Sequence, residues 1–259
     1  MIILPNKEYN NESNEKINTY QFLAHVGCPV FNSILFDTDE KLDIEKLKQI
    51  REVLNSDYCT VRYQYIKPTI NPIKGGNKSL ISLDALEAKK VDGTMLWLLE
   101  PIDRTKNIYG INVYVNRKYE FIEIEVVGRG FDVSDLNRGN ISPQETITSN
   151  YPIEYGWNNE WWKYLKFTYT SDSKFQDDKK LRIQKLNGFG LKVDETIFDL
   201  NFKPLSFEKL EKILECIEAI DQNWDKSDEY TVSISVNDNN KLVFWDIQTP
   251  KGKLKILRR

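Results

Sequence analysis

The segment TMLWLLEPIDRTKNIYGINVYVNRKYEFIEIEVVGRGFDVSDLNRGNISPQE, Thr94 to Glu145, decides the fold. Its apolar and β-branched runs predict three successive strands: one that ends at Glu100-Pro101, one over Ile108–Val115 and one over Tyr119–Val127. A Gly-Arg-Gly sequence follows the third run and predicts a turn. The centre of the chain is therefore expected to be a series of strands that pair with their neighbours.

The third predicted strand carries two carboxylates. Glu123 and Glu125 are two residues apart, so the pleat of a strand turns both side chains to one face. Ile122, Ile124 and Val126 take the opposite face. Two carboxylates on one face, beside a glycine turn, suit a site for a metal ion and phosphate groups.

Composition sets the broad class. A chain of 259 residues with 40% hydrophobic and 29% charged residues can bury a full core, as one domain or as two lobes around a cleft. The net charge of −3 provides no basic field for nucleic acid. No apolar run reaches the roughly 20 residues of a membrane span, and the polar beginning has no signal-peptide core. These features predict a cytoplasmic protein.

The cysteines and the histidine restrict the chemistry. Cys28, Cys59 and Cys216 are odd in number, widely spaced and set among apolar residues, which predicts reduced, buried thiols. His25 is the single histidine of the chain. Most zinc sites and catalytic triads are therefore excluded.

The remaining elements follow from periodicity. The predicted helices cover residues 16–24, 43–54, 83–90 and 206–221, and the predicted strands cover Ile2–Leu4, Phe31–Phe36, Tyr58–Tyr65, Tyr230–Val236 and Leu242–Gln248. Arg62 lies in the middle of a strand, where its charge needs an anion or a carboxylate partner. A phosphate contact and an internal salt bridge are both open. The segment around Gly75-Gly76 is either a phosphate-binding lid or a hairpin turn with exposed lysines.

This order of elements resembles the nucleotide-binding domain of the phosphoenolpyruvate synthase and pyruvate phosphate dikinase group, a branch of the ATP-grasp enzymes. Glu100 stands where that group has a hinge residue, Tyr109–Val113 is similar to its next strand, and Glu123–Pro143 is similar to the segment after it. The glycines that fall in step are Gly128, Gly130 and Gly139. The resemblance covers the first two-thirds and the last fifth of the chain.

The resemblance implies which residues bind nucleotide phosphates. Lys16, at the head of a helix that leads into the turn at residues 27–30, would contact phosphate, and so would Arg62. Where the family has two serines after this arginine, the chain has Tyr63-Gln64. The implied lid consists of Lys74, Gly75, Gly76 and Lys78.

The resemblance also implies where adenine and magnesium bind. The backbone next to Glu100 would hydrogen-bond the adenine ring. A magnesium ion would lie on Glu123 or Glu125 together with Asp246 or Gln248, since Asp246 and Gln248 share a strand face and offer oxygen ligands. ATP and Mg²⁺ are thus the implied cofactors.

The implied fold is α/β in the α+β sense: two-lobed, ATP-grasp-like, with mostly antiparallel sheets and flanking helices. Residues 1–92 would form an N-terminal lobe with the phosphate-binding lid, and residues 93–259 a C-terminal lobe with an insert of unknown role at 150–205. The implied function is Mg-ATP-dependent phosphoryl transfer, as a phosphotransferase or a ligase. The acceptor would be a small hydroxyl or carboxylate compound, or a histidine of a separate partner protein.

Two alternatives remain open. The family has a glutamate in the strand that corresponds to Tyr230–Val236, and its absence from Tyr230-Thr231-Val232-Ser233 favours a catalytically inactive, nucleotide-binding interaction module. In addition, Lys90-Val91-Asp92-Gly93 fits the Lys-x-Asp-Gly motif of covalent nucleotidyltransferases and RNA ligases, whose lysine attacks the α-phosphate of ATP.

The nucleotidyltransferase hypothesis has a direct test. Incubation with Mg-ATP should then add one AMP to the protein mass, and Lys90→Ala should abolish the adduct, because the lysine amine is the nucleophile. Intact-protein mass spectrometry measures both. An unchanged wild-type mass removes this alternative and leaves the phosphoryl-transfer hypothesis untouched.

Overall fold

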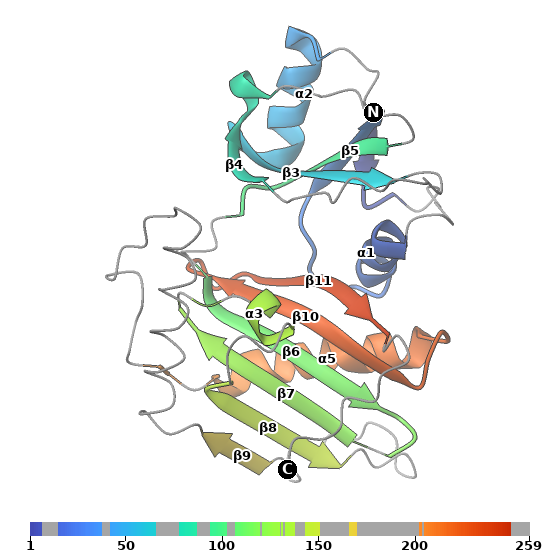
Figure 1. Ribbon diagram of the computed structural model, residues 1–259, viewed down its shortest axis with the longest axis vertical. Coiled ribbons are helices and arrows are strands. Elements are labelled where there is room, and N and C mark those ends of the chain that lie inside the picture. The colour runs from blue at the N-terminus through green and yellow to red at the C-terminus, as the bar shows by residue number, and fades with distance from the viewer. Residues whose placement is uncertain are drawn as a thin grey trace. The chain divides into compact units, whose positions relative to one another are not determined.

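The computed structural model of the chain has an α+β fold with two antiparallel sheets (Figure 1). It describes residues 1–6, 15–37, 42–65, 78–86, 94–102, 107–119, 121–129, 131, 133–137, 143–150, 166–169, 202–203 and 205–249. The chain divides into two compact units, Met1–Asp103 and Arg104–Arg259. Among the described helices, none is long and apolar enough to cross a membrane.

The first unit contains a five-stranded sheet in the order β1-β2-β5-β3-β4, with every pair antiparallel. Its elements are β1 (Ile2–Leu4), α1 (Glu15–His25), β2 (Ser33–Asp37), α2 (Ile44–Leu54), β3 (Tyr58–Tyr65), β4 (Lys78–Ser82), the 3-10 turn η1 (Leu83–Ala85) and β5 (Thr94–Leu99). Because β5 lies between β2 and β3, the unit continues beyond the expected lobe boundary at residue 92.

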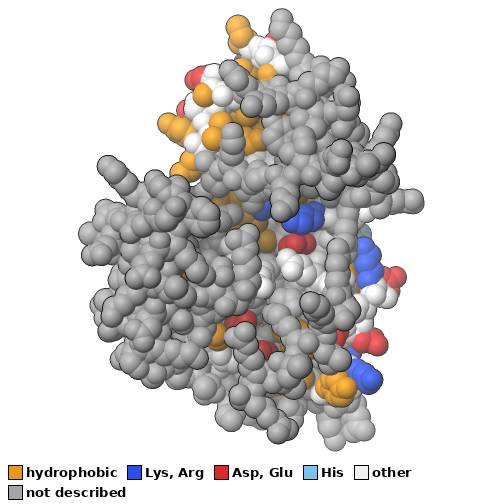
Figure 2. Space-filling view, in the orientation of Figure 1, with side chains coloured by type: hydrophobic (Ala, Val, Ile, Leu, Met, Phe, Trp, Pro, Cys, Tyr) orange, Lys and Arg blue, Asp and Glu red, His pale blue; other side chains and the backbone are white. Residues whose placement is uncertain are grey.

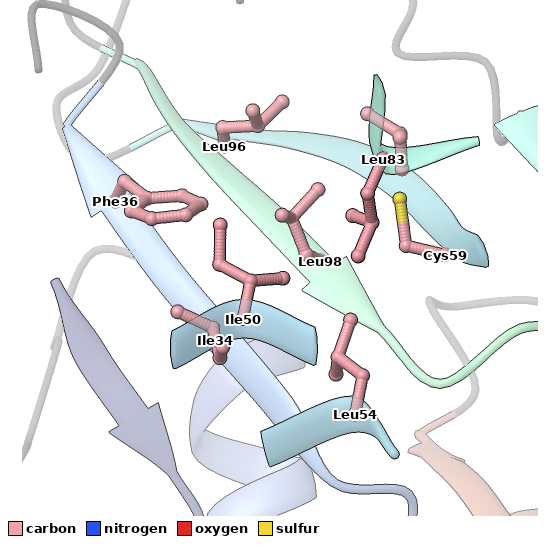
Figure 3. Packing of buried hydrophobic residues seen from close by; sticks show 9 residues of the cluster. Ile34, Phe36, Ile50, Leu54, Cys59, Leu83, Leu96 and Leu98 are labelled. Atoms are coloured by element: carbon pink, nitrogen blue, oxygen red, sulfur yellow. The ribbon is translucent and has the colours of Figure 1, made fainter. Parts of the chain in front are cut away.

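Helix α2 covers one face of this sheet. The Asp43 carboxylate accepts a hydrogen bond from the backbone N–H of Lys46 at 2.9 Å, which satisfies a donor at the start of the helix. The apolar side chains of α2 pack on alternate residues of the strands (Figure 3). The buried members of this cluster are Ile34, Phe36, Ile50, Leu54, Cys59, Val61, Leu83, Leu96 and Leu98.

Helix α1 covers the opposite face. The Tyr20 and Trp97 rings meet edge to face with their centroids 5.3 Å apart, and the Trp97 indole N–H donates to Ser33 Oγ at 2.9 Å. Ser33 and Trp97 alternate with the residues that contact α2, which is the period of two expected of strands. The five-stranded sheet is thus covered by one helix on each side (Figure 1).

The second unit contains a six-stranded antiparallel sheet in the order β11-β10-β6-β7-β8-β9. Its elements are β6 (Asn107–Asn116), β7 (Phe121–Gly128), α3 (Val133–Asn137), β8 (Glu145–Asn150), β9 (Lys166–Tyr169), α5 (Phe207–Asn223), β10 (Glu229–Asn237) and β11 (Leu242–Gln248). Helix α5 crosses one face and α3 lies on the other (Figure 1). The predicted cap is confirmed, since the Ser206 hydroxyl accepts from the Lys209 N–H at 3.4 Å.

Two predictions differ from the structure. The expected helix over residues 83–90 is only the 3-10 turn η1, because Leu86 has an extended backbone with ψ of 106°. Residues 87–93 lie outside the described part. The elements α3 and β8 were not predicted; only a turn at Gly-Arg-Gly was expected between β7 and Pro143.

The three cysteines confirm the sequence prediction, because all are free and buried. Burial raises the pKa of the Cys59 thiol to about 12, so the thiol stays protonated at neutral pH. These thiols therefore act as small apolar core residues.

Strand β4 contains a strained residue. Leu80 has a positive φ of 55°, at an irregularity of the β3–β4 register, and 46% of its surface is exposed. A leucine in this conformation costs about 1–2 kcal/mol, which a glycine avoids. The strain lies at a bulge on the edge of the sheet.

Leu80→Gly is therefore expected to stabilise the protein by up to about 1 kcal/mol, because relief of strain exceeds the entropy cost of glycine. Leu80→Ala is the control, since it removes the side chain but keeps the strained conformation. Urea unfolding of both variants measures the difference. Equal stabilities of the two variants would show that Leu80 is not strained.

Candidate functional site

The face of the six-stranded sheet opposite α5 carries two adjacent polar rows. The register aligns the first row across five strands, from β11 to β8, as Asp246, Ser233, Asn112, Glu125 and Thr146. The second row, two residues further along each strand, consists of Gln248, Thr231, Tyr114, Glu123 and Thr148. We call these residues the polar face. It gathers four of the predicted site residues on one surface.

The alternate residues of the same strands form the core. Val113, Ile124 and Val232 are aligned in one row and are fully buried. Their side chains lie on the face that α5 covers with its own apolar stripe. Because the pleat has a period of two, burial of one face turns every polar side chain to the other.

The polar face is itself partly covered. Asn112 and Ser233 are only 2% and 3% exposed, whereas Glu123, Glu125 and Asp246 are half-buried. Acidic side chains are visible among the described residues in the view of Figure 2. Helix α3 lies against this face and is anchored to it in two ways: by a hydrogen bond from Asn137 Nδ2 to Ser233 Oγ at 3.0 Å, and by a small apolar cluster. The cluster consists of Val127, Phe131 and Leu136.

A β-bulge shapes the end of the first row. Ser233 pairs with Asp246 but Ile234 pairs with Phe244, so Trp245 is an extra residue in β11. The Trp245 indole N–H donates to Ser235 Oγ at 2.8 Å. A bulge re-aims the side chains next to it, and here the neighbouring side chain is the Asp246 carboxylate.

The Tyr114 hydroxyl joins the second row to the neighbouring strand β10. It donates to a carboxylate oxygen of Glu229 and accepts from Asn116 Nδ2 at 3.0 Å. Burial, together with the hydrogen bond to Glu229, raises the pKa of the Tyr114 phenol to about 12. At neutral pH the phenol is therefore a fixed neutral donor.

Asp246 and Gln248 fit a magnesium site of the kind that is shared with a substrate. They lie on one face of β11, and Gln248 Nε2 donates to Asp246 Oδ2 at 3.3 Å. Mg²⁺ in nucleotide sites commonly takes one or two carboxylates and completes its shell with water and phosphate oxygens. Within the described residues there is no group of three His, Cys, Asp or Glu that could hold a metal ion. Asp246 and Gln248 together offer one carboxylate and one amide oxygen.

The register separates the acidic pair of β7 from the Asp246 and Gln248 pair of β11, which were expected to hold one ion together. Strands β6 and β10 separate β7 from β11. Three strand spacings put the backbones of Glu125 and Asp246 about 14 Å apart. A magnesium ion shared by Glu123 or Glu125 and Asp246 or Gln248 would need side chains that extend from both sides across the two strands between them. Such a shared ion stays a prediction.

Lys16 and Arg62 belong to the first unit. Lys16 is exposed on α1. Arg62 pairs with Trp97 across β3 and β5, and its guanidinium carbon lies 5.7 Å from the centre of the Trp97 ring. This cation–π contact stabilises the half-buried charge within the unit. A phosphate role for Lys16 and Arg62 stays a prediction.

Glu100 has a structural role that the sequence did not show. Its backbone N–H donates to the Asn32 carbonyl oxygen at 3.0 Å, and its carboxylate accepts from the Asn32 N–H at 2.8 Å. Pro101 has no N–H, and the Ile102 N–H donates to Thr60 Oγ1 at 3.0 Å. Adenine binding by the backbone next to Glu100 stays a prediction.

The other predicted site residues lie outside the described part of the structure. These are Lys74, Gly75, Gly76 and Lys90. Lys78 begins β4, but its side chain is not among those described.

Six residues of the polar face were not predicted as site residues: Asn112, Tyr114, Thr146, Thr148, Thr231 and Ser233. The signal was present, because Gly110, Asn112, Tyr114 and Asn116 alternate with apolar residues, as Glu123 and Glu125 do. Strand order was needed to bring these alternating patterns together.

Comparisons with known proteins give structural matches only. No family model and no curated protein sequence matches the chain. D-alanyl-alanine synthetase A from Vibrio cholerae matches 92% of this chain and 55% of its own, with 9% identity and a TM-score of 0.45. Macrocyclase MdnC from Microcystis aeruginosa, bound to its precursor peptide, matches 91% and 52%, with 10% identity and a TM-score of 0.37.

A third match, the D-alanine-D-alanine ligase from Coxiella burnetii, covers 92% of this chain and 47% of its own, with 10% identity and a TM-score of 0.40. The chain thus spans about half the length of these proteins. At these identities and TM-scores the likeness is one of chain arrangement alone.

The Tyr114 hydroxyl provides a pH-dependent test of the polar face. The unfolded phenol titrates near pH 10. The stability that the neutral folded phenol contributes is therefore complete below about pH 10 and is lost as the pH rises through about 12. Tyr114→Phe should flatten this alkaline loss, and should cost about 1 kcal/mol at pH 7 because two hydrogen bonds disappear.

Urea unfolding at pH 7 to 11 measures this dependence. Tyr119→Phe, at an exposed tyrosine in the turn after β6, controls for the loss of one phenol. If Tyr114→Phe retains the wild-type alkaline slope, the raised pKa is wrong.

Proposed function

We propose that this chain binds Mg-ATP on the polar face of its six-stranded sheet and transfers a phosphoryl group, as an enzyme of ATP-grasp type. The observation that supports the proposal is the pair Asp246 and Gln248, two oxygen ligands on one side of β11, at the end of a polar row that crosses the sheet. The order of elements that resembles the ATP-grasp nucleotide domain supports it as well. The narrower phosphoenolpyruvate synthase type is part of the same proposal.

Each residue of the proposed site has a defined task. Asp246 and the side-chain oxygen of Gln248 would hold the ion, and the rest of the polar face would order the ligand by hydrogen bonds. For Lys16, Arg62, Lys74 and Lys78, a phosphate contact stays a prediction from the sequence. The bound nucleotide would supply a phosphoryl group that activates a carboxylate or hydroxyl acceptor.

A second candidate function is nucleotide binding without turnover. Ser233 stands opposite Asp246 in the register, is 3% exposed and accepts a hydrogen bond from Asn137. The position opposite Asp246 thus carries a neutral, buried hydroxyl and not a second carboxylate. On the described parts of β10 and β11, Asp246 is the only carboxylate in the first row of the polar face. ADP release separates the two functions: turnover with any carboxylate or hydroxyl acceptor excludes the inactive module.

Asp246→Asn tests the metal site. Wild-type protein should gain about 2.7 kcal/mol of stability at a Mg-ATP concentration of a hundred times Kd. Asp246→Asn removes the charge that binds the cation, so a tenfold weaker Kd should lower this gain to about 1.4 kcal/mol. Thermal unfolding with ATP, in the presence and absence of Mg²⁺, measures the gain.

Asp238→Asn is the matched control, because Asp238 is an exposed aspartate in the turn between the same two strands. It should keep the full magnesium-dependent gain. A wild-type protein that shows no stabilisation by Mg-ATP refutes the proposed function. An Asp246→Asn variant with the full gain refutes the assignment of the metal ligand only.

A further inference from the structure

The side chain of Asn112 lies near the centre of the polar face. It belongs to β6 and is 2% exposed, with Ser233 on one side and Glu125 on the other in the register. Its Oδ1 atom is 3.5 Å from the Ser233 hydroxyl, which donates to it. Its Nδ2 atom is buried and has no hydrogen-bond partner in the part of the chain that the structure describes. Two amide N–H groups are therefore removed from water without compensation.

Asn116 shows that the same strand can satisfy such a side chain. It lies on the same face of β6 and is 7% exposed. Its Nδ2 atom donates to the Tyr114 hydroxyl at 3.0 Å, and its Oδ1 atom accepts from the Tyr119 N–H at 3.1 Å. Buried polar groups are almost always paired in this way. Within the described residues, the unpaired donor at Asn112 is therefore a position that an acceptor atom of a ligand would satisfy.

The position of Asn112 restricts the chemistry of that partner. An amide N–H binds an acceptor atom, so neither a bare cation nor an apolar group fits. Two strands away, about 10 Å along the same row, lies the Asp246 carboxylate. A phosphate group whose oxygens contact a cation at Asp246 would extend from β11 toward β10 and β6. Phosphate oxygens accept strong, charge-assisted hydrogen bonds from such donors.

Helix α3 is the described element that covers this part of the face. It packs on β6, β7 and β10, and Asn137 of α3 bonds the same Ser233 hydroxyl that contacts Asn112. A ligand atom that reaches Asn112 Nδ2 must therefore lie between α3 and the sheet. The ligand would replace part of the contact between α3 and the sheet.

We propose that the Asn112 side-chain amide donates a hydrogen bond to a phosphate oxygen at the cation-bound end of the nucleotide. This inference rests on the proposed function, because it assumes that Mg-ATP binds on the polar face. The inference adds Asn112, a residue of the polar face on β6, to the residues that would contact the phosphate chain. It involves the second unit alone.

The test compares Asn112→Val with the matched control Asn116→Val. Isothermal titration gives Kd for Mg-ATP, Mg-ADP and AMP, and urea unfolding gives the stability of the ligand-free proteins. Asn112→Val should weaken Mg-ATP binding about tenfold to a hundredfold, because one charge-assisted hydrogen bond is lost. AMP affinity should stay within about twofold. The ligand-free variant should be as stable as wild type or more stable, since an unpaired buried donor has been removed.

The control should behave in the opposite way. Asn116→Val breaks existing hydrogen bonds, so it should lower the ligand-free stability and leave Kd for Mg-ATP unchanged. If Asn112→Val does not fold, Asn112→Asp replaces it, because it keeps the shape and the acceptor but loses the donor. It should weaken Mg-ATP binding at least as much.

Three outcomes overturn the inference. Unchanged Mg-ATP affinity in a folded Asn112 variant removes the contact while the proposed function stands. If the Asn112 variant loses as much affinity for AMP as for Mg-ATP, Asn112 does not contact the cation-bound phosphates. A wild-type protein that binds none of the three nucleotides refutes the proposed function itself, and this result is visible before any variant is made.

Discussion

The antiparallel register of the six-stranded sheet is the constraint on which the candidate site depends. Side chains alternate between the two faces of a strand, and neighbouring strands align them in rows. Val113, Ile124 and Val232 must stay beneath α5, which holds Asn112, Glu125 and Ser233 on the other side. A slip of one residue in any strand would exchange the two sets. The free energy of the core thus fixes the geometry of the polar surface.

Much of the fold could be predicted from local patterns. The strands at residues 58–65 and 242–248 have the predicted bounds, and Ser206 caps its helix as expected. What could not be predicted depends on contacts between distant segments. β5 pairs with β2 and β3, so it belongs to the first unit. The order β11-β10-β6-β7 likewise puts two strands between the Glu123 and Glu125 pair and the Asp246 and Gln248 pair, for which the family resemblance implied a shared ion.

The site residues show the same division. Period-2 alternation in one strand predicted Glu123 and Glu125 as site residues, and the family resemblance implied Asp246 and Gln248. Asn112 could not be predicted as a site residue, because the role of an asparagine within a strand depends on its neighbours in the sheet and on its burial. Its unpaired amide is a cost to the folded protein. Such local costs are typical of residues that are kept for binding rather than for stability.

The strand order also determines how easily each part of the polar face can open. Within the described residues β11 pairs only with β10, so it is an edge strand. The bulge at Trp245 interrupts this single ladder next to Asp246. Edge strands exchange their amide hydrogens through small local openings that central strands such as β6 do not undergo. Asp246 and Gln248, the proposed ligands, therefore lie on a strand that one ladder holds, whereas Asn112 lies on a strand that is held on both sides.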